Sequence, residues 1–141
     1  MDKAQKGFTL IELVVVITIL GILAAFAFPR FAALEVEARS ATINGLAGSV
    51  RSAASLAHSL DLVGAEVVME GNTIAMIFGY PSQLVGGIQD TLVDTTGFGY
   101  DSTNGLFTAN GATTPATCSV AYASSTAANL PPAITVLTGG C

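Results

Sequence analysis

The chain has 141 residues, 51% of them hydrophobic, and a formal net charge of −5. This length suits one domain together with one membrane or assembly helix. Residues 52–141 contain no Lys or Arg, which disfavours nucleic-acid binding by that part of the chain.

An apolar run covers residues 8–28 and includes a single charged residue, Glu12. As a helix it would span roughly 31 Å, close to the thickness of a bilayer's hydrocarbon core. A carboxylate inside such a segment costs several kcal/mol and usually pairs with another group. The run therefore predicts a membrane or assembly helix in which Glu12 needs a partner.

The residues around this run indicate the direction of export. Lys3 and Lys6 precede it, an asymmetry that keeps the N-terminus in the cytoplasm while the residues after the run are exported. An ordinary secretory signal is the alternative, with Ala25-Phe26-Ala27 as its cleavage site. The apolar region of a signal peptide is about 7–15 residues long and needs no acid, so this alternative is disfavoured.

A second helical pattern begins after Pro29. Over residues 31–62 apolar side chains recur every three to five positions, which predicts an amphipathic helix with one buried face. Because Pro29 lies between the two patterns, we expect one long helix with a kink. The expected buried face contains Leu34, Ala38, Ile43, Leu46, Val50, Ala54 and Ala57.

Residues 63–141, which we call the head, change to a strand pattern. Residues 66–70 and 73–78 read as two strands joined at Gly71-Asn72, because this pair tolerates the positive φ of a tight turn. Gly79-Tyr80-Pro81 is expected to end the second strand, and residues 82–93 to form a short helix.

The rest of the head is expected to be a loop and then two strands. Residues 95–117 are rich in Gly, Thr, Asn and Ser and read as loop. Residues 118–122 and 133–137 are strand-like. Cys118 and Cys141 bracket them, and two cysteines in an exported head are most simply a disulfide.

The run Gly7-Phe8-Thr9-Leu10-Ile11-Glu12, with the apolar helix and Pro29 after it, resembles the processing and assembly signature of type IV pilins and type II secretion pseudopilins. The ending between Cys118 and Cys141 most resembles the mannose-sensitive haemagglutinin class of pilins. The resemblance implies an α+β pilin fold, with a long N-terminal helix packed on a small antiparallel β-sheet and a disulfide-bounded loop at residues 118–141.

The resemblance also implies processing. A membrane peptidase would remove residues 1–7 as a leader by cutting between Gly7 and Phe8, and would methylate the new amine of Phe8. Residues 8–30 would then be the transmembrane and assembly helix, and residues 31–62 the amphipathic helix.

The resemblance implies two further roles for residues of the apolar helix. The amine of Phe8 would pair with Glu12 of the same or a neighbouring chain, because pairing neutralises two charges that a dry environment penalises separately. Type IV pilins unwind in the filament at the place where this chain has Gly21 and Pro29, so the segment between these residues is expected to melt on assembly.

The implied function is that of a structural major pilin, polymerising through its N-terminal helix for adhesion, aggregation, biofilm formation or twitching motility. Its expected partners are further copies of the chain, the prepilin peptidase, the pilus assembly platform and the inner membrane of a Gram-negative bacterium. The alternatives are a pseudopilin or a DNA-uptake or adhesive pilin. The predicted disulfide favours the major pilin, because pseudopilins more often have a calcium-bound loop.

Other candidate sites have simpler explanations, and we expect no enzymatic activity, cofactor or metal. Ser55, His58 and Asp61 form a row on one helix with no oxyanion donors, which favours a solvated face over a catalytic set. The acids Asp90, Asp94 and Asp101 lack the spacing of a calcium loop. The Ser/Thr-rich residues 113–117 and 124–126 read as loop rather than as acceptors of O-linked sugars.

Overall fold

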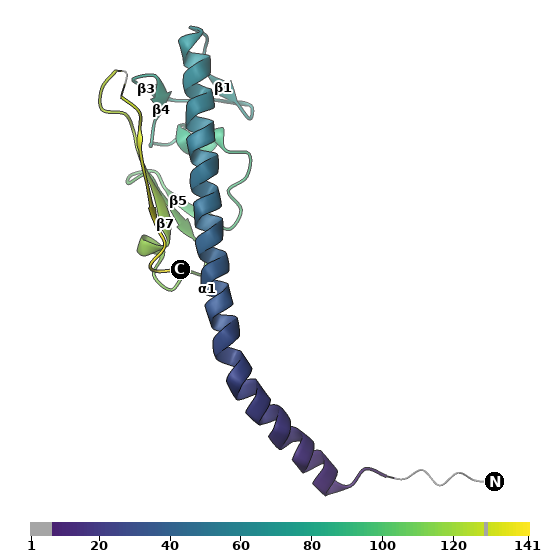
Figure 1. Cartoon of the computed structure of the whole chain (residues 1–141). Helices are drawn as coiled ribbons and strands as arrows, with labels where there is room; N and C mark the ends of the chain where they lie inside the picture. The colour runs from purple at the N-terminus through teal and green to yellow at the C-terminus, as the bar shows by residue number, and fades with distance from the viewer. Residues whose placement is uncertain (1–6, 129) are drawn as a thin grey trace, which may run out of the picture. The chain divides into compact units, whose positions relative to one another are not determined.

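The computed structural model describes residues 7–128 and 130–141. The chain divides into an N-terminal unit, Met1–Val36, and a C-terminal unit, Glu37–Cys141. Helix α1 (Leu10–Leu62) contributes residues to both and continues through Pro29 (Figure 1). The single long helix is therefore confirmed.

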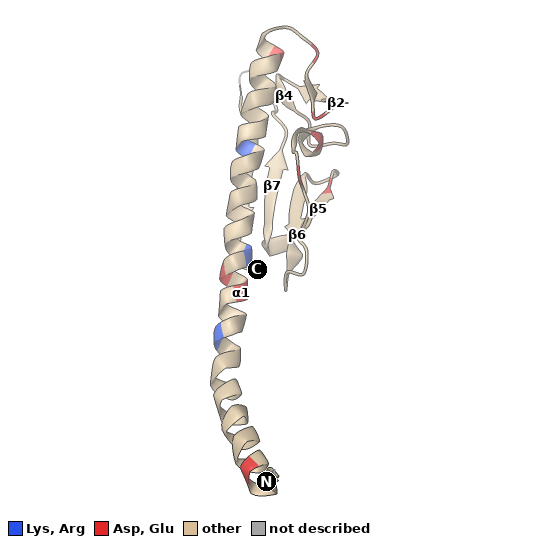
Figure 2. Ribbon diagram, turned by 90° about the vertical axis from the view of Figure 1, so that its right-hand side faces the viewer, with Lys and Arg blue, Asp and Glu red and all other residues tan. Residues whose placement is uncertain are grey.

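In the N-terminal unit, every described residue of 7–36 is exposed. Residues 13–29 include no charged side chain, and Figure 2 shows this uncharged stretch of α1. By length and composition α1 could cross a membrane. An apolar helix exposed on all sides needs either lipid or other helices to cover it.

In the C-terminal unit, α1 buries one face against the sheet (Figure 1). Leu34, 60% exposed, and Ala38 are exposed, so these two predicted core residues were wrong. Periodicity identifies a helix face but not how far along the helix the sheet extends. The buried residues of α1 are Ile43, Leu46, Ala47, Val50, Ala53, Ala54 and Ala57.

The first hairpin of the head joins β1 (Val68–Met69) to β2 (Asn72–Thr73). Its turn residues are Glu70 and Gly71, with φ of 50° and 81°, the combination of a type I′ turn. The turn predicted at Gly71-Asn72 was wrong by one residue, because Asn72 pairs with Met69 in the ladder.

A second hairpin lies where one strand and its end were predicted. β3 (Met76–Ile77) pairs with β4 (Tyr80–Pro81) around Phe78 and Gly79, whose φ values are 50° and 84°. The predicted strand 73–78 is therefore divided between two hairpins. Gly79-Tyr80-Pro81 does not end a strand but forms part of a turn and β4.

The helix predicted over residues 82–93 was also wrong in extent. Only η1 (Ile88–Thr91), a 3-10 turn, forms there. Gly86 has a φ of 82°, and Gly87 packs so closely on the backbone of Ser82 that a Cβ would overlap it. These two glycines end any regular helix before Ile88.

The main sheet is four-stranded and antiparallel, in the order β5-β6-β7-β8. The predicted loop 95–117 contains β5 (Phe98–Asp101), β6 (Leu106–Ala109) and the 3-10 turn η2 (Pro115–Thr117), so that prediction was wrong. β7 (Ser119–Ala123) and β8 (Ala133–Leu137) confirm the two predicted C-terminal strands.

Cys118 and Cys141 form a disulfide with their Cα atoms 4.7 Å apart. Both cysteines are buried in the core cluster with Phe107, Val120 and Tyr122. Arg39 of α1 donates a hydrogen bond to the carbonyl of Cys141. The predicted α+β fold, with its long helix, small antiparallel sheet and C-terminal disulfide loop, is confirmed.

Candidate assembly site at the start of α1

Thr9 and Glu12 form a reciprocal hydrogen-bonded cap at the start of α1. Oε2 of Glu12 accepts a bond of 2.8 Å from the backbone N–H of Thr9 and one of 2.6 Å from its hydroxyl. Oγ1 of Thr9 in turn accepts a 3.3 Å bond from the backbone N–H of Glu12. This is a capping box, in which the side chains at Ncap and N3 each satisfy a free backbone donor.

The capping box gives Glu12 a partner that the sequence analysis missed. Its signal was present as Thr9-x-x-Glu12 directly before an apolar run, the pattern of a helix N-terminus. A negative side chain in the first turn also stabilises the positive end of the helix dipole. Glu12 therefore has a local structural role in addition to the predicted role in assembly.

The predicted pairing of Glu12 with the Phe8 amine stays a prediction. In the uncut chain the nitrogen of Phe8 belongs to a neutral peptide bond with Gly7, so the required cation does not exist. Phe8 is 79% exposed. Together with Ile11, Glu12, Val15 and Val16 it lines an open hollow of about 330 Å³ on the helix surface.

Gly21 and Pro29 both lie within the helical part of α1. Pro29 has no N–H to donate to the carbonyl of Ala25, so the hydrogen-bond ladder lacks one bond there. Open space surrounds Gly21, where an added Cβ would meet no atom within 4 Å. Melting of this segment on assembly stays a prediction.

His58 anchors the second hairpin of the head to α1. Its Nδ1 donates a 2.6 Å hydrogen bond to the carbonyl of Gly79, and its ring stacks on Tyr80 with centroids 4.1 Å apart. The imidazole is therefore engaged with the β3–β4 turn. This contact gives His58 a packing role that explains its position in the row with Ser55 and Asp61.

Asp94 and Asp101 each stabilise a turn of the head. Asp94 accepts a 2.7 Å bond from the N–H of Thr96, and Asp101 accepts bonds from Thr103 and Asn104. The side chains of Thr96 and Asn104 are the main reason that the pKa values of Asp94 and Asp101 lie below their usual range. Within residues 7–128 and 130–141, no three His, Cys, Asp or Glu side chains cluster as metal ligands.

Two tyrosines of the main sheet are hydrogen-bonded to β4 and to the segment that follows it. The hydroxyl of Tyr122 donates a 2.6 Å bond to the carbonyl of Pro81, and that of Tyr100 donates to the carbonyl of Gln83. Burial raises the pKa of the Tyr122 phenol and raises that of Tyr100 to about 12. Folding therefore favours the protonated form of both phenols.

Residues 2–28 match the family described as the prokaryotic N-terminal methylation motif. The chain is 54% identical over 52 residues to a type IV narrow pilus major component of Thermus thermophilus, which is 37% of this chain and 45% of that protein. It is 36% identical over 95 residues to a fimbrial protein of Pseudomonas aeruginosa, 67% of this chain and 56% of that one.

A type IV major fimbrial protein of Dichelobacter nodosus is 44% identical over 71 residues, 50% of this chain and 38% of that protein. The chain thus spans about half the length of the curated relatives that it matches. No solved structure matches it.

Proposed function

Because the chain is a type IV pilin by its methylation motif and its relatives, we propose that it is a structural subunit of an extracellular pilus filament. The observation that carries this proposal is the apolar half of α1, which the subunit leaves uncovered. A helix of this kind is stable only inside lipid or against similar helices, and a filament supplies the second.

Processing precedes assembly in this proposal. The prepilin peptidase cuts between Gly7 and Phe8, removes residues 1–7 as a leader and methylates the amine of Phe8. The motif match across residues 2–28 supports this step. The cut removes both lysines and leaves residues 8–30 in the inner membrane of a Gram-negative bacterium, ready for the assembly platform.

Cleavage changes the environment of Glu12. It creates a cation on Phe8, one residue before the Ncap Thr9, where the helix dipole disfavours positive charge. Glu12 of the same chain, or of a subunit already in the filament, neutralises this amine. The charge pair and the capping box use the same carboxylate, so Glu12 links the start of the helix to subunit register.

The assignment to the mannose-sensitive haemagglutinin class stays a prediction from the C-terminal end of the chain. We further propose that the filament serves adhesion, aggregation, biofilm formation or twitching motility.

Electron microscopy of material sheared from cells, with intact-mass analysis of the subunit, tests the proposed function. We expect thin filaments whose subunit mass corresponds to a chain beginning at methylated Phe8. A subunit that retains Met1, or that begins at Phe28 after cleavage behind Ala25-Phe26-Ala27, would contradict the proposed processing. Absence of this chain from sheared filaments would contradict the proposed function.

A further inference from the structure

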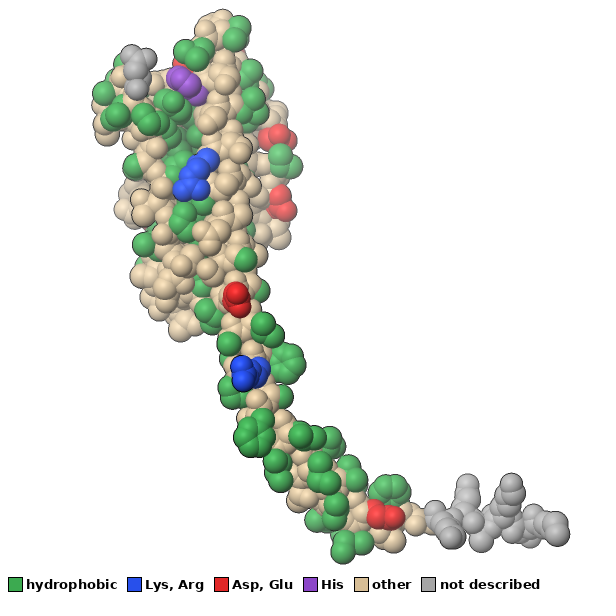
Figure 3. All heavy atoms as spheres, viewed as in Figure 1, with side chains coloured by type: hydrophobic (Ala, Val, Ile, Leu, Met, Phe, Trp, Pro, Cys, Tyr) green, Lys and Arg blue, Asp and Glu red, His purple; other side chains and the backbone are tan. Residues whose placement is uncertain are grey.

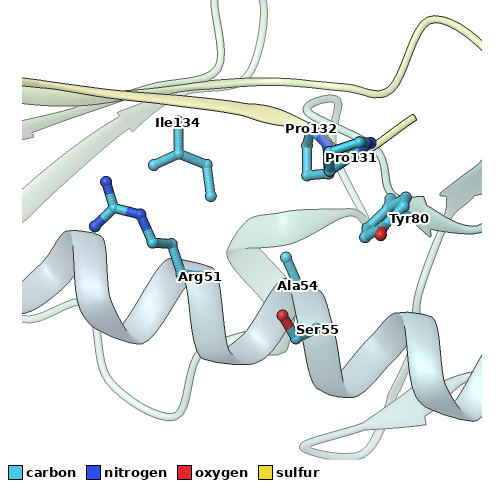
Figure 4. A pocket seen from close by; sticks show the side chains of 7 residues that line it. All are labelled: Arg51, Ala54, Ser55, Tyr80, Pro131, Pro132 and Ile134. Carbon is cyan, nitrogen blue, oxygen red and sulfur yellow. The ribbon is translucent and has the colours of Figure 1, made fainter. Parts of the chain in front are cut away.

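An open groove of about 380 Å³ lies in the C-terminal unit between α1 and the segment leading into β8. Figure 4 shows Arg51 and Ile134 at one end, Tyr80 and the two prolines at the other, and the short side chains of α1 between them. Its lining is Arg51, Ala54, Ser55, Tyr80, Pro131, Pro132 and Ile134. The groove thus combines one cation with largely apolar walls.

Arg51 is the last cation of the sequence, and its side chain is exposed. In the part of the chain that the structure describes, no carboxylate forms an ion pair with it. A guanidinium presents several donors in a plane that matches a carboxylate, and neighbouring apolar walls strengthen such a pair by excluding water. The groove therefore suits a partner that offers a carboxylate beside an apolar side chain.

The head itself exposes such a pair at Val93-Asp94. Val93 is 82% exposed, and Asp94 next to it is also exposed. The hydrogen bond from the N–H of Thr96 holds the carboxylate of Asp94 in place. In Figure 3 acidic side chains lie along one edge of the head, apart from the basic side chains of α1.

The two features lie on different sides of α1, so one subunit cannot join them internally. Arg51, Ala54 and Ser55 line the groove. The segment 91–94 instead borders Gly48, Ser49, Ser52 and Ala53. At about 100° per residue these two sets occupy different sectors of the helix surface.

We propose that Val93-Asp94 of one subunit docks in the Arg51 groove of a neighbouring copy, with Asp94 paired to Arg51 and Val93 against the apolar wall. This inference rests on the proposed filament. Two different patches on each molecule form a heterologous contact, which generates an open helical array when the rotation does not close. The contact would lock heads together outside the helical core.

Charge reversal in the full chain, expressed in cells that make the filaments, tests this contact. Arg51→Asp and Asp94→Arg should each increase, by several fold, the fraction of subunit released from sheared filaments on heating. The double variant restores the pair in reversed order and should release subunit within about twofold of the original chain, because coupled residues show non-additive effects.

Asp101→Arg is the matched control. Asp101 is exposed and hydrogen-bonded in a turn like Asp94, but no exposed valine precedes it. It should neither loosen the filament by itself nor rescue Arg51→Asp. Arg51→Gln removes the charge without reversing it and should give a smaller increase in released subunit. It serves as a second test in case Arg51→Asp impairs folding.

The outcomes separate this inference from the proposed function. Single reversals that release no more subunit than the original chain, in filaments that form normally, would overturn the contact alone. A double variant that releases as much subunit as the single variants would also overturn the contact. Stable Arg51→Asp filaments that no longer attach cells to a surface would assign the groove to an external ligand. If the original chain forms no filaments, the proposed function itself fails.

Discussion

Thr9 and Glu12 are hydrogen-bonded in both directions, since the hydroxyl of Thr9 donates to Oε2 of Glu12 at 2.6 Å and accepts from the backbone N–H of Glu12 at 3.3 Å. Removing Glu12 therefore removes two things: a helix cap and the charge proposed to meet the Phe8 amine. A single nonpolar substitution cannot distinguish these roles.

A comparison of Glu12→Gln with Glu12→Val distinguishes the role in the helix cap from the role of the charge. Glutamine can still complete a capping box, whereas valine cannot, and neither carries a charge. If charge pairing sets subunit register, both variants should insert into the membrane but assemble few filaments, counted by electron microscopy. Hydrogen exchange in micelles should show early loosening of the first turn only in Glu12→Val. Normal filament numbers in Glu12→Gln would show that the cap alone is needed.

Gly7→Leu should block leader removal. A small residue at the cut lets the peptidase approach the backbone, and a branched side chain obstructs this approach. We expect uncut chain in the inner membrane, with both lysines still present by mass spectrometry. Phe8→Leu, which keeps the glycine, should still be cut. Efficient cleavage of Gly7→Leu would place the peptidase site elsewhere.

A near-atomic map of the filament tests the segment from Gly21 to Pro29. We expect an extended break there, because Pro29 already lacks one ladder bond and glycine is a weak helix former. Gly21→Ala favours the helix by about 1 kcal/mol and should shorten the break or lower filament yield. Gly45→Ala is the control, since an added Cβ also meets open space there. Unbroken helix from Phe8 through Phe31 would refute melting.

Loss of the disulfide should destabilise the head. Closing a loop with a sequence separation of 23 stabilises by about 3 kcal/mol in the chain-entropy model. We therefore expect the double variant Cys118→Ala, Cys141→Ala to unfold in detergent at lower denaturant concentration and to give fewer surface filaments. Thiol labelling of the unfolded, unreduced original chain should find neither cysteine free; full labelling would exclude the bond.

Alkaline pH should destabilise the head through Tyr122, which is buried, and Tyr100, which is partly buried. The pKa of Tyr122 is raised, and that of Tyr100 is raised to about 12, whereas an unfolded phenol ionises near 10. Their contribution to stability is therefore present below about pH 10 and is lost as pH rises above it. Unfolding temperatures measured from pH 8 to 12 should fall beyond pH 10.

Tyr122→Phe should show a smaller decrease over this pH range. At neutral pH it should cost about 1–2 kcal/mol, because the carbonyl of Pro81 loses its donor. An alkaline decrease as large as that of the original chain would assign the effect to other groups.

The long helix and the last two strands could be predicted because each has a regular pattern. The apolar run is long enough for a membrane helix, and the apolar positions from Ile43 to Ala57 recur with helical spacing. β7 and β8 are strand-like runs that lie between the two cysteines. Glu12 stands out in the sequence as the only charge in the apolar run, although its role in the helix cap depends on Thr9 three residues earlier.

The middle of the head could not be predicted because its strands are short and its turns use unusual residues. Phe78 adopts a φ of 50°, a conformation that sequence patterns assign to Gly or Asn. β5 and β6 lie in a Gly- and Thr-rich stretch, and Gly105, just before β6, closely approaches the backbone of Tyr122 in β7. That contact joins residues far apart in the sequence, so no local pattern reveals it.

The disulfide also controls how much chain the head can release under tension. It joins residues on either side of the β7–β8 hairpin, with a sequence separation of 23. Pulled straight, those residues would extend by roughly 70–80 Å. When the cysteines are joined, force passes through the disulfide instead of the chain between them. The residues of this loop then cannot be extended, even in an unfolded head. A head pulled by residue 141 should therefore release less chain in oxidising surroundings than after reduction.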